Sequence, residues 1–142
     1  MYLAILCAFA GLMSISASSL SENADKVVAA EADELAMWLS DKMSEARLED
    51  AVLKILVSKD PSGNAVLLMT WLSNPSRQSE KYTSSSVVIR NEEASSYSFT
   101  YDGRWQTMTP AMMFSVRPLP GRKAAMRIVT VSGAGYVRVR KN

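Results

Sequence analysis

The first 21 residues of the chain carry no charge, and they lead into a segment that contains no helix-breaking residue for a long stretch. No Gly or Pro occurs between Leu12 and Asp60. From Glu22 onward apolar side chains recur at steps of three or four residues, which is the spacing of one face of an α-helix. The members of this apolar stripe are Val28, Ala32, Leu35, Leu39, Lys42/Met43 and Ala46. The sequence therefore predicts one continuous helix that runs to about Leu53.

The apolar start, residues 1–20, has three interpretations. As a transmembrane helix, it would reach roughly 30 Å, which matches the hydrocarbon core of a bilayer. As a cleavable secretion signal, it would end in small residues at 16–18, although no Lys or Arg precedes the apolar core. As a helix buried in a soluble fold, it would need apolar surroundings that the rest of the chain hardly provides.

Charge divides the remaining chain into an acidic stalk, residues 21–53, and a basic head, residues 54–142. Residues 21–50 hold nine acids against three bases, whereas residues 51–142 hold five acids against thirteen bases. This asymmetry would let the stalk of one copy attract the head of another, or let the head meet an anionic polymer. The alternative is that these are simply solvated faces of opposite sign.

The apolar spacing changes to two after the helix, which is typical of half-buried strands. At 142 residues the chain can build one core. We expect an α+β fold in which the long N-terminal helix, with Trp38 on its inner side, packs on a mostly antiparallel head of one or two layers. Turn signals stand at 60–64, at Asp102-Gly103 and at 132–135, and residues 73–86 form the longest predicted loop. The predicted strands are 52–58, 65–72, 86–90, 97–101, 104–108, 112–117, 125–131 and 136–140.

Residues that carry chemistry are scarce. The chain has no histidine, which removes the commonest general base and metal ligand, and its one cysteine lies in the apolar start. No nucleophile elbow, phosphate-binding loop or cysteine pair occurs. We therefore expect no enzyme, no catalytic or metal-binding residue, no cofactor and no small-molecule substrate.

Two surfaces are candidates for binding. The first is the helix, whose apolar positions would pack against other helices in a membrane or filament. The second is the C-terminal strand, on which an aromatic ring and guanidinium groups would share one face and could bind DNA, unless the charges only protect a sheet edge. The helix-packing candidates are Ile5, Phe9, Leu12, Val28, Leu35 and Leu39. The DNA-binding candidates are Tyr136, Arg138, Arg140 and Lys141, with Arg117, Arg122, Lys123 and Arg127 as an extension.

The chain resembles the minor type IV pilin-like proteins, and within them the pseudopilin H and FimT-like branch. The resemblance covers most of the chain as an arrangement: an apolar start, a helix with Glu-Leu-Ala at 34–36 and Ser-Glu-Ala-Arg at 44–47, and a β head that ends in Ile-Val-Thr-Val-Ser at 128–132 and Gly-Tyr-Val-Arg-Val at 135–139.

The resemblance implies a protein of the bacterial inner membrane with a periplasmic head, which joins other pilin or pseudopilin subunits in a type IV pilus or a type II secretion filament. In such families a peptidase cuts after a Gly and leaves a Glu at the fifth position, whereas this sequence has no acid before Glu22. Some FimT-like members bind DNA through a Gly-Arg-x-Arg element, for which 135–140 is the nearest match. The alternative is a secreted or periplasmic β domain whose first 17 or 18 residues are removed and which binds an unknown partner.

Overall fold

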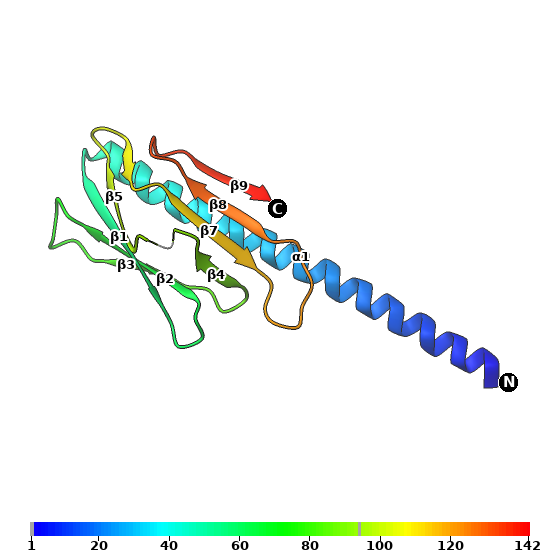
Figure 1. The fold of residues 1–142 in the computed structure, drawn as a ribbon. Helices are drawn as coiled ribbons and strands as arrows, with labels where there is room; N and C mark the ends of the chain where they lie inside the picture. The colour runs from blue at the N-terminus through cyan, green and yellow to red at the C-terminus, as the bar shows by residue number, and fades with distance from the viewer. Residues whose placement is uncertain (1, 94) are drawn as a thin grey trace.

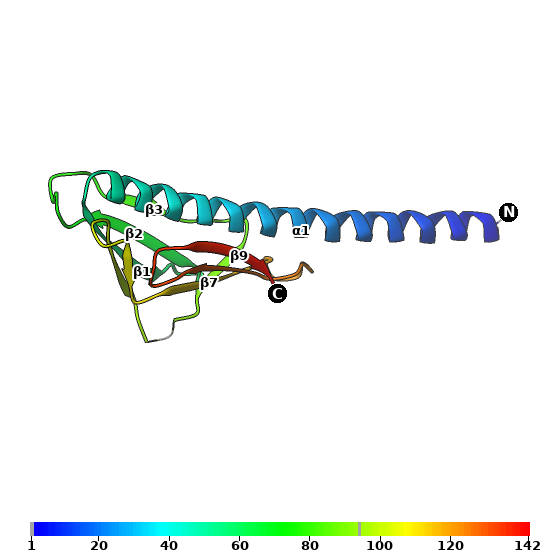
Figure 2. The same cartoon turned by 90° about the horizontal axis from the view of Figure 1, so that it is seen from above.

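One helix lies along two antiparallel sheets in the computed structural model, which describes residues 2–93 and 95–142, with side chains from Glu22 onward. The helix α1 (Tyr2–Leu48) begins far outside the head and ends at its distal tip (Figure 1). Both sheets lie on the same side of α1 (Figure 2). The predicted α+β class, a long N-terminal helix packed on an antiparallel β head, is confirmed, and of the one or two layers expected the head has two sheets.

Nine strands follow α1 within the described residues, and every pairing between them is antiparallel. The five-stranded sheet has the order β3-β2-β1-β5-β6, and the four-stranded sheet has the order β4-β7-β8-β9. The strands are β1 (Val52–Lys59), β2 (Ala65–Trp71), β3 (Glu80–Tyr82), β4 (Val88–Asn91), β5 (Ser98–Asp102), β6 (Thr107–Thr109), β7 (Met112–Arg117), β8 (Arg127–Val131) and β9 (Val137–Lys141).

The predicted strands match β1, β2, β4, β5, β7, β8 and β9 to within two residues. The strand predicted at 104–108 is wrong in its first half, because Gln106 has a positive φ of 53° and the chain turns there before β6 begins. The predicted loop 73–86 contains the short strand β3, which pairs with the edge of β2. We call residues 72–87, which connect the two sheets, the crossover segment.

The helix was predicted to run to about Leu53, but α1 ends at Leu48. Asp50 has a positive φ of 51°, and the Ala51 amide donates to the Ala46 carbonyl at 2.8 Å. This hydrogen bond closes the end of the helix, since it satisfies a carbonyl that has no partner within the helix. The chain then turns directly into β1.

The turn at Asp102-Gly103 is present, but its glycine is required by contact rather than by positive φ. A Cβ atom at Gly103 would lie 2.1 Å from the carbonyl oxygen of Ala46 and 2.8 Å from that of Ala51. The Gly103 amide also donates to the Ala51 carbonyl at 2.8 Å. The absence of a side chain therefore lets the end of the five-stranded sheet touch the end of α1.

The core fills the space between α1 and the two sheets. The apolar stripe of the helix is buried as predicted, and Trp38 packs beside it with its ring centroid 5.5 Å from that of Tyr82. Inward-facing residues of both sheets meet the stripe, so that one core unites the head. Its largest fully buried side chains include Leu35, Leu39, Met43, Leu53, Ile55, Phe99, Tyr101 and Phe114.

Candidate assembly surfaces

The N-terminal part of α1 extends beyond both sheets (Figures 1 and 2). The contact between helix and head begins near Ala24, which is 3% exposed, and Asp25, whose carboxylate accepts a hydrogen bond from the Ala125 amide at 3.0 Å. About 20 helical residues precede this point, which corresponds to roughly 30 Å of helix. The predicted packing residues Ile5, Phe9 and Leu12 lie outside the residues whose side chains the structure describes.

The other predicted packing residues of the helix lie in the core. Val28 is 1% exposed, and Leu35 and Leu39 are 0% exposed, because the chain's own sheets cover them. A neighbouring helix cannot reach these side chains unless the head separates from α1. The prediction that they pack against other subunits is therefore corrected: the apolar stripe of residues 28–46 holds the head and is not available for packing between helices.

The outer face of α1 beside the head is acidic and exposed. Glu22, Asp33, Glu34 and Asp41 all lie on it, and Met37, which is 64% exposed, stands among them. The acids are spread over several turns, with the exposed Lys26 among them, so the face carries a net negative charge along the helix. The acidic stalk predicted from the sequence is thus a solvent-facing surface.

Other charges of α1 hold the crossover segment in place. Arg77 donates to Glu45 at 2.8 Å and to Glu49 at 2.6 Å, and its guanidinium carbon lies 3.9 Å from the centroid of the Trp71 ring. Lys42 bridges Glu45 and Glu80 at 3.3 and 2.6 Å. An arginine that pairs with two carboxylates and stacks on an indole is fixed in orientation as well as in charge.

Glu31 anchors the other end of the crossover segment. Its carboxylate accepts hydrogen bonds from Tyr82 at 2.8 Å, from Ser84 at 2.7 Å and from Ser86 at 2.7 Å. Desolvation by itself would raise the pKa of Glu31, but the hydrogen bonds from Ser86, Ser84 and Tyr82 outweigh it, so the pKa lies below the usual 4.5. Burial and the carboxylate of Glu31 together raise the pKa of the Tyr82 hydroxyl.

The four-stranded sheet turns a basic face to solvent. Arg138 pairs with Thr130 and Arg140 with Ile128 across β8 and β9, so both arginines point away from the core, whereas Val137 and Val139 pack against it. Residues two apart on a strand are separated by roughly 7 Å. Within the described part of the chain neither guanidinium has a hydrogen-bond or ion-pair partner. β9 is also the edge of its sheet.

The remaining DNA-binding candidates are not all on this face. Lys141 lies opposite Arg127 across β8 and β9 and alternates with Arg140, so it points to the other side of the sheet. Tyr136 precedes β9, is 69% exposed and lines a surface hollow with Ser40 and Arg47 of α1.

Of the predicted extension, Arg117 shares the face with Arg138 and Arg140 but forms an ion pair with Glu92 at 3.5 Å. Arg122 and Lys123 lie in the loop before β8. Arg90 was not among the residues predicted for this face. It pairs with Ser115, which pairs with Ile128, which in turn pairs with Arg140, so Arg90 lies in the same row as Arg140. Strand order decides this alignment, and a single strand's alternation could not reveal it.

Within the described residues, no group of three or more His, Cys, Asp or Glu side chains could hold a metal ion. Among the helices of the same residues, none is long and apolar enough to cross a membrane.

The single N-terminal helix extends beyond the head and packs lengthwise on two antiparallel sheets. This is the arrangement of a type IV pilin-like fold. No protein-family model matches the sequence, and no curated protein is significantly similar to it. Two crystal structures of the type IV minor pilin FimU of Pseudomonas aeruginosa share its fold at 19% sequence identity. One gives a TM-score of 0.60 over 80% of this chain and 87% of FimU, and the other gives 0.58 over 77% and 89%. The chain therefore has a minor pilin-like fold, as predicted.

Proposed function

We propose that this chain is a structural, non-enzymatic subunit of a type IV pilus or a type II secretion filament, and that it assembles with other pilin or pseudopilin subunits through the first part of α1. The observation that carries the proposal is the part of α1, about 30 Å long, that extends beyond both sheets (Figures 1 and 2). The likeness of the fold to FimU supports the same assignment.

Before assembly, the uncharged residues 1–21 would hold the protein in the bacterial inner membrane, with the head in the periplasm. The rival proposal is a secreted or periplasmic β domain from which this segment is removed. N-terminal sequencing of the mature protein separates the two. Material that keeps residues before Ser16 supports anchoring, and freely soluble material that begins at Ser18 or Ser19 supports the rival.

The test of the filament proposal places a charge in the part of α1 that extends beyond the head. Leu12→Asp should remove the chain from sheared filaments, because a carboxylate cannot be buried among apolar helices without a partner. Leu72→Asp is the matched control, since Leu72 is an exposed leucine of the head, 49% exposed. Equal recovery of both variants in filaments, detected with an antibody to the head, would exclude assembly through this segment.

DNA binding by the head is a second candidate function. Arg138 and Arg140 favour it, because both guanidinium groups lie on one exposed face without partners in the described structure. Arginines at roughly 7 Å spacing can contact successive phosphates of a nucleic-acid strand. Such contacts weaken as the salt concentration rises, because the release of counterions from the DNA then gains less free energy.

The test of DNA binding uses two variants of equal charge. R138A/R140A should weaken binding to a duplex of mixed sequence and lower the slope of affinity against salt by about two. K54A/K81A removes two cations from the five-stranded sheet, so it controls for net charge. If the two variants lose affinity equally, the effect is that of net charge alone and the site on β9 is refuted.

A further inference from the structure

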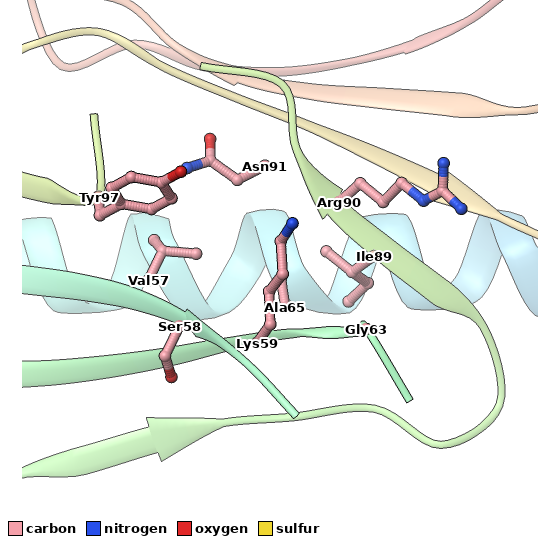
Figure 3. Close-up of a pocket in the computed structure, with 9 residues that line it drawn as sticks. All are labelled: Val57, Ser58, Lys59, Gly63, Ala65, Ile89, Arg90, Asn91 and Tyr97. Atoms are coloured by element: carbon pink, nitrogen blue, oxygen red, sulfur yellow. The ribbon is translucent and has the colours of Figure 1, made fainter. Parts of the chain in front are cut away.

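A cavity of about 460 Å³ opens between the tip of the β1–β2 hairpin and the strand β4 of the other sheet (Figure 3). It exists because β5 begins at Ser98, opposite Leu56. Beyond that pair the backbone contact on this side is the hydrogen bond from the Val57 amide to the Tyr97 carbonyl at 2.8 Å, whereas β1 continues to Lys59. The volume is within the usual range for small-molecule sites, about 300 to 1,000 Å³. The cavity is separate from the free part of α1 and from β9.

The inner wall of the cavity is apolar. Val57, Ala65 and Ile89 are all buried, at 6%, 3% and 0% exposure, and they come from both sheets. The ring of the exposed residue Tyr97 adds a fourth apolar surface. Because Val57, Ala65 and Ile89 have almost no accessible surface left, a compact apolar ligand would mainly cover the ring of Tyr97 and lie above these three side chains.

The charge at the cavity is positive and unbalanced. Lys59 lies on the same side of β1 as Ile55 and Val57, at the point where the core ends. In Figure 3 its ammonium group lies between Tyr97 and Arg90, whereas the guanidinium of Arg90 is directed away from Tyr97 and Asn91. Within the described residues neither cation has a partner, and no carboxylate lines the cavity.

The edge of β4 is closed to an added strand. The Asn64 side chain accepts a hydrogen bond from the Ile89 amide at 2.6 Å and donates to the Val87 carbonyl at 3.1 Å. A buried amide that occupies both a donor and an acceptor of a strand edge takes the place of a neighbouring strand. An extended peptide cannot pair with β4 here, so the site fits a compact ligand better than a chain.

We propose that this cavity binds a small organic acid, with its carboxylate on the ammonium group of Lys59 and its apolar body against the ring of Tyr97, above the floor formed by Val57, Ala65 and Ile89. A carboxylate is the group that an unpaired ammonium beside an apolar wall would recognise. The Asn91 side chain holds the adjoining loop through the Ser96 carbonyl at 2.9 Å, so it shapes the wall. Arg90 stands at the border and adds to the positive potential.

The experiment titrates the full-length chain in detergent with phenylacetate and follows the methyl signal of Ile89 by NMR. Phenylacetamide is the matched neutral probe, and inorganic phosphate is the charged probe without an apolar body. Phenylacetate should give a saturable shift that neither of the others gives. Lys59→Met, which keeps the length of the side chain, should weaken the affinity about tenfold or more, and Lys81→Met on β3 should leave it unchanged.

The proposal is overturned if phenylacetate gives no saturable shift, if phenylacetamide gives the same shift, or if K59M binds as well as the parent. A shift with phosphate equal to that with phenylacetate would show that the apolar body of the ligand contributes nothing to binding. The comparison of the three probes is made on the parent chain, so it stands even if K59M folds poorly. Each result is independent of filament assembly, because none of these residues lies on α1 or β9.

Discussion

The two sheets hold the same helix by different means. The five-stranded sheet and the crossover segment meet α1 through close backbone contact at Gly103 and through polar groups, among them the carboxylate of Glu31 and the guanidinium of Arg77. The four-stranded sheet meets α1 mainly through apolar side chains such as Val129 and Val139. In the described structure, the hydrogen bond from the Ala125 amide to Asp25 is the polar link on that side.

This difference separates structural charges from charges that remain available. On the side of the crossover segment, the charged groups of α1 are used within the chain. On the outer face of the four-stranded sheet, Arg138 and Arg140 are left without partners. A change in a charged residue should therefore cost stability on the first side and binding on the second.

The largest expected effect compares two glycines. Gly103→Ala should destabilise the fold by about 3 kcal/mol, because the new Cβ would overlap the backbone carbonyl of Ala46, which cannot move without shifting the end of α1. Gly133→Ala, in the β8–β9 turn, is the control, since the nearest atom to its Cβ is 3.8 Å away. Equilibrium unfolding in urea measures both. Similar losses would show that the contact at Gly103 has no special role.

An intermediate effect is expected at Glu31. Glu31→Ala leaves the hydroxyls of Tyr82, Ser84 and Ser86 without their acceptor, and should cost about 1 to 3 kcal/mol at neutral pH. Glu34→Ala, which removes an exposed carboxylate one turn further along, should change the stability by less than about 0.5 kcal/mol.

The contribution of Glu31 depends on pH in a defined direction. Its pKa in the folded state is below the unfolded value of 4.5, so the stabilisation by its ionised form is complete above that value and is lost as pH falls through the folded pKa. The difference in free energy of unfolding between the parent and E31A should accordingly shrink in acid. A difference that stays constant to the lowest accessible pH would contradict the network.

The sequence predicted the helix, the antiparallel pairing and most strands because each depends on local periodicity. The apolar stripe was predicted correctly as one face of a helix that packs on the head, but Val28, Leu35 and Leu39 were also assigned to packing between subunits, since spacing shows that a face is buried and not what buries it. The strand β3 was missed because three residues at an edge give no alternating pattern. Its place is set by pairing with β2 and by contacts from Glu31 and Lys42.

The candidate surfaces show the same limit. Alternation correctly placed Arg138 and Arg140 on one face, whereas Arg90 joined them only through the register of β4, β7, β8 and β9. Lys59 could not be recognised from sequence, because its cavity results from β1 extending past the first residue of β5 in a sheet whose order is non-sequential.

The smallest expected effect on stability compares arginines on the two sides. Arg77→Ala removes two ion pairs and the contact with Trp71, and should cost about 1 to 2 kcal/mol. R138A/R140A removes twice as many charges, yet it should change the free energy of unfolding by less than about 0.5 kcal/mol, since neither side chain has a partner in the described structure. The midpoints of urea unfolding measure both losses, provided that the dependence of the free energy of unfolding on urea concentration stays the same. A loss in the double variant equal to that of R77A would mean that these arginines stabilise the sheet, and β9 would then have no free charge to offer a partner.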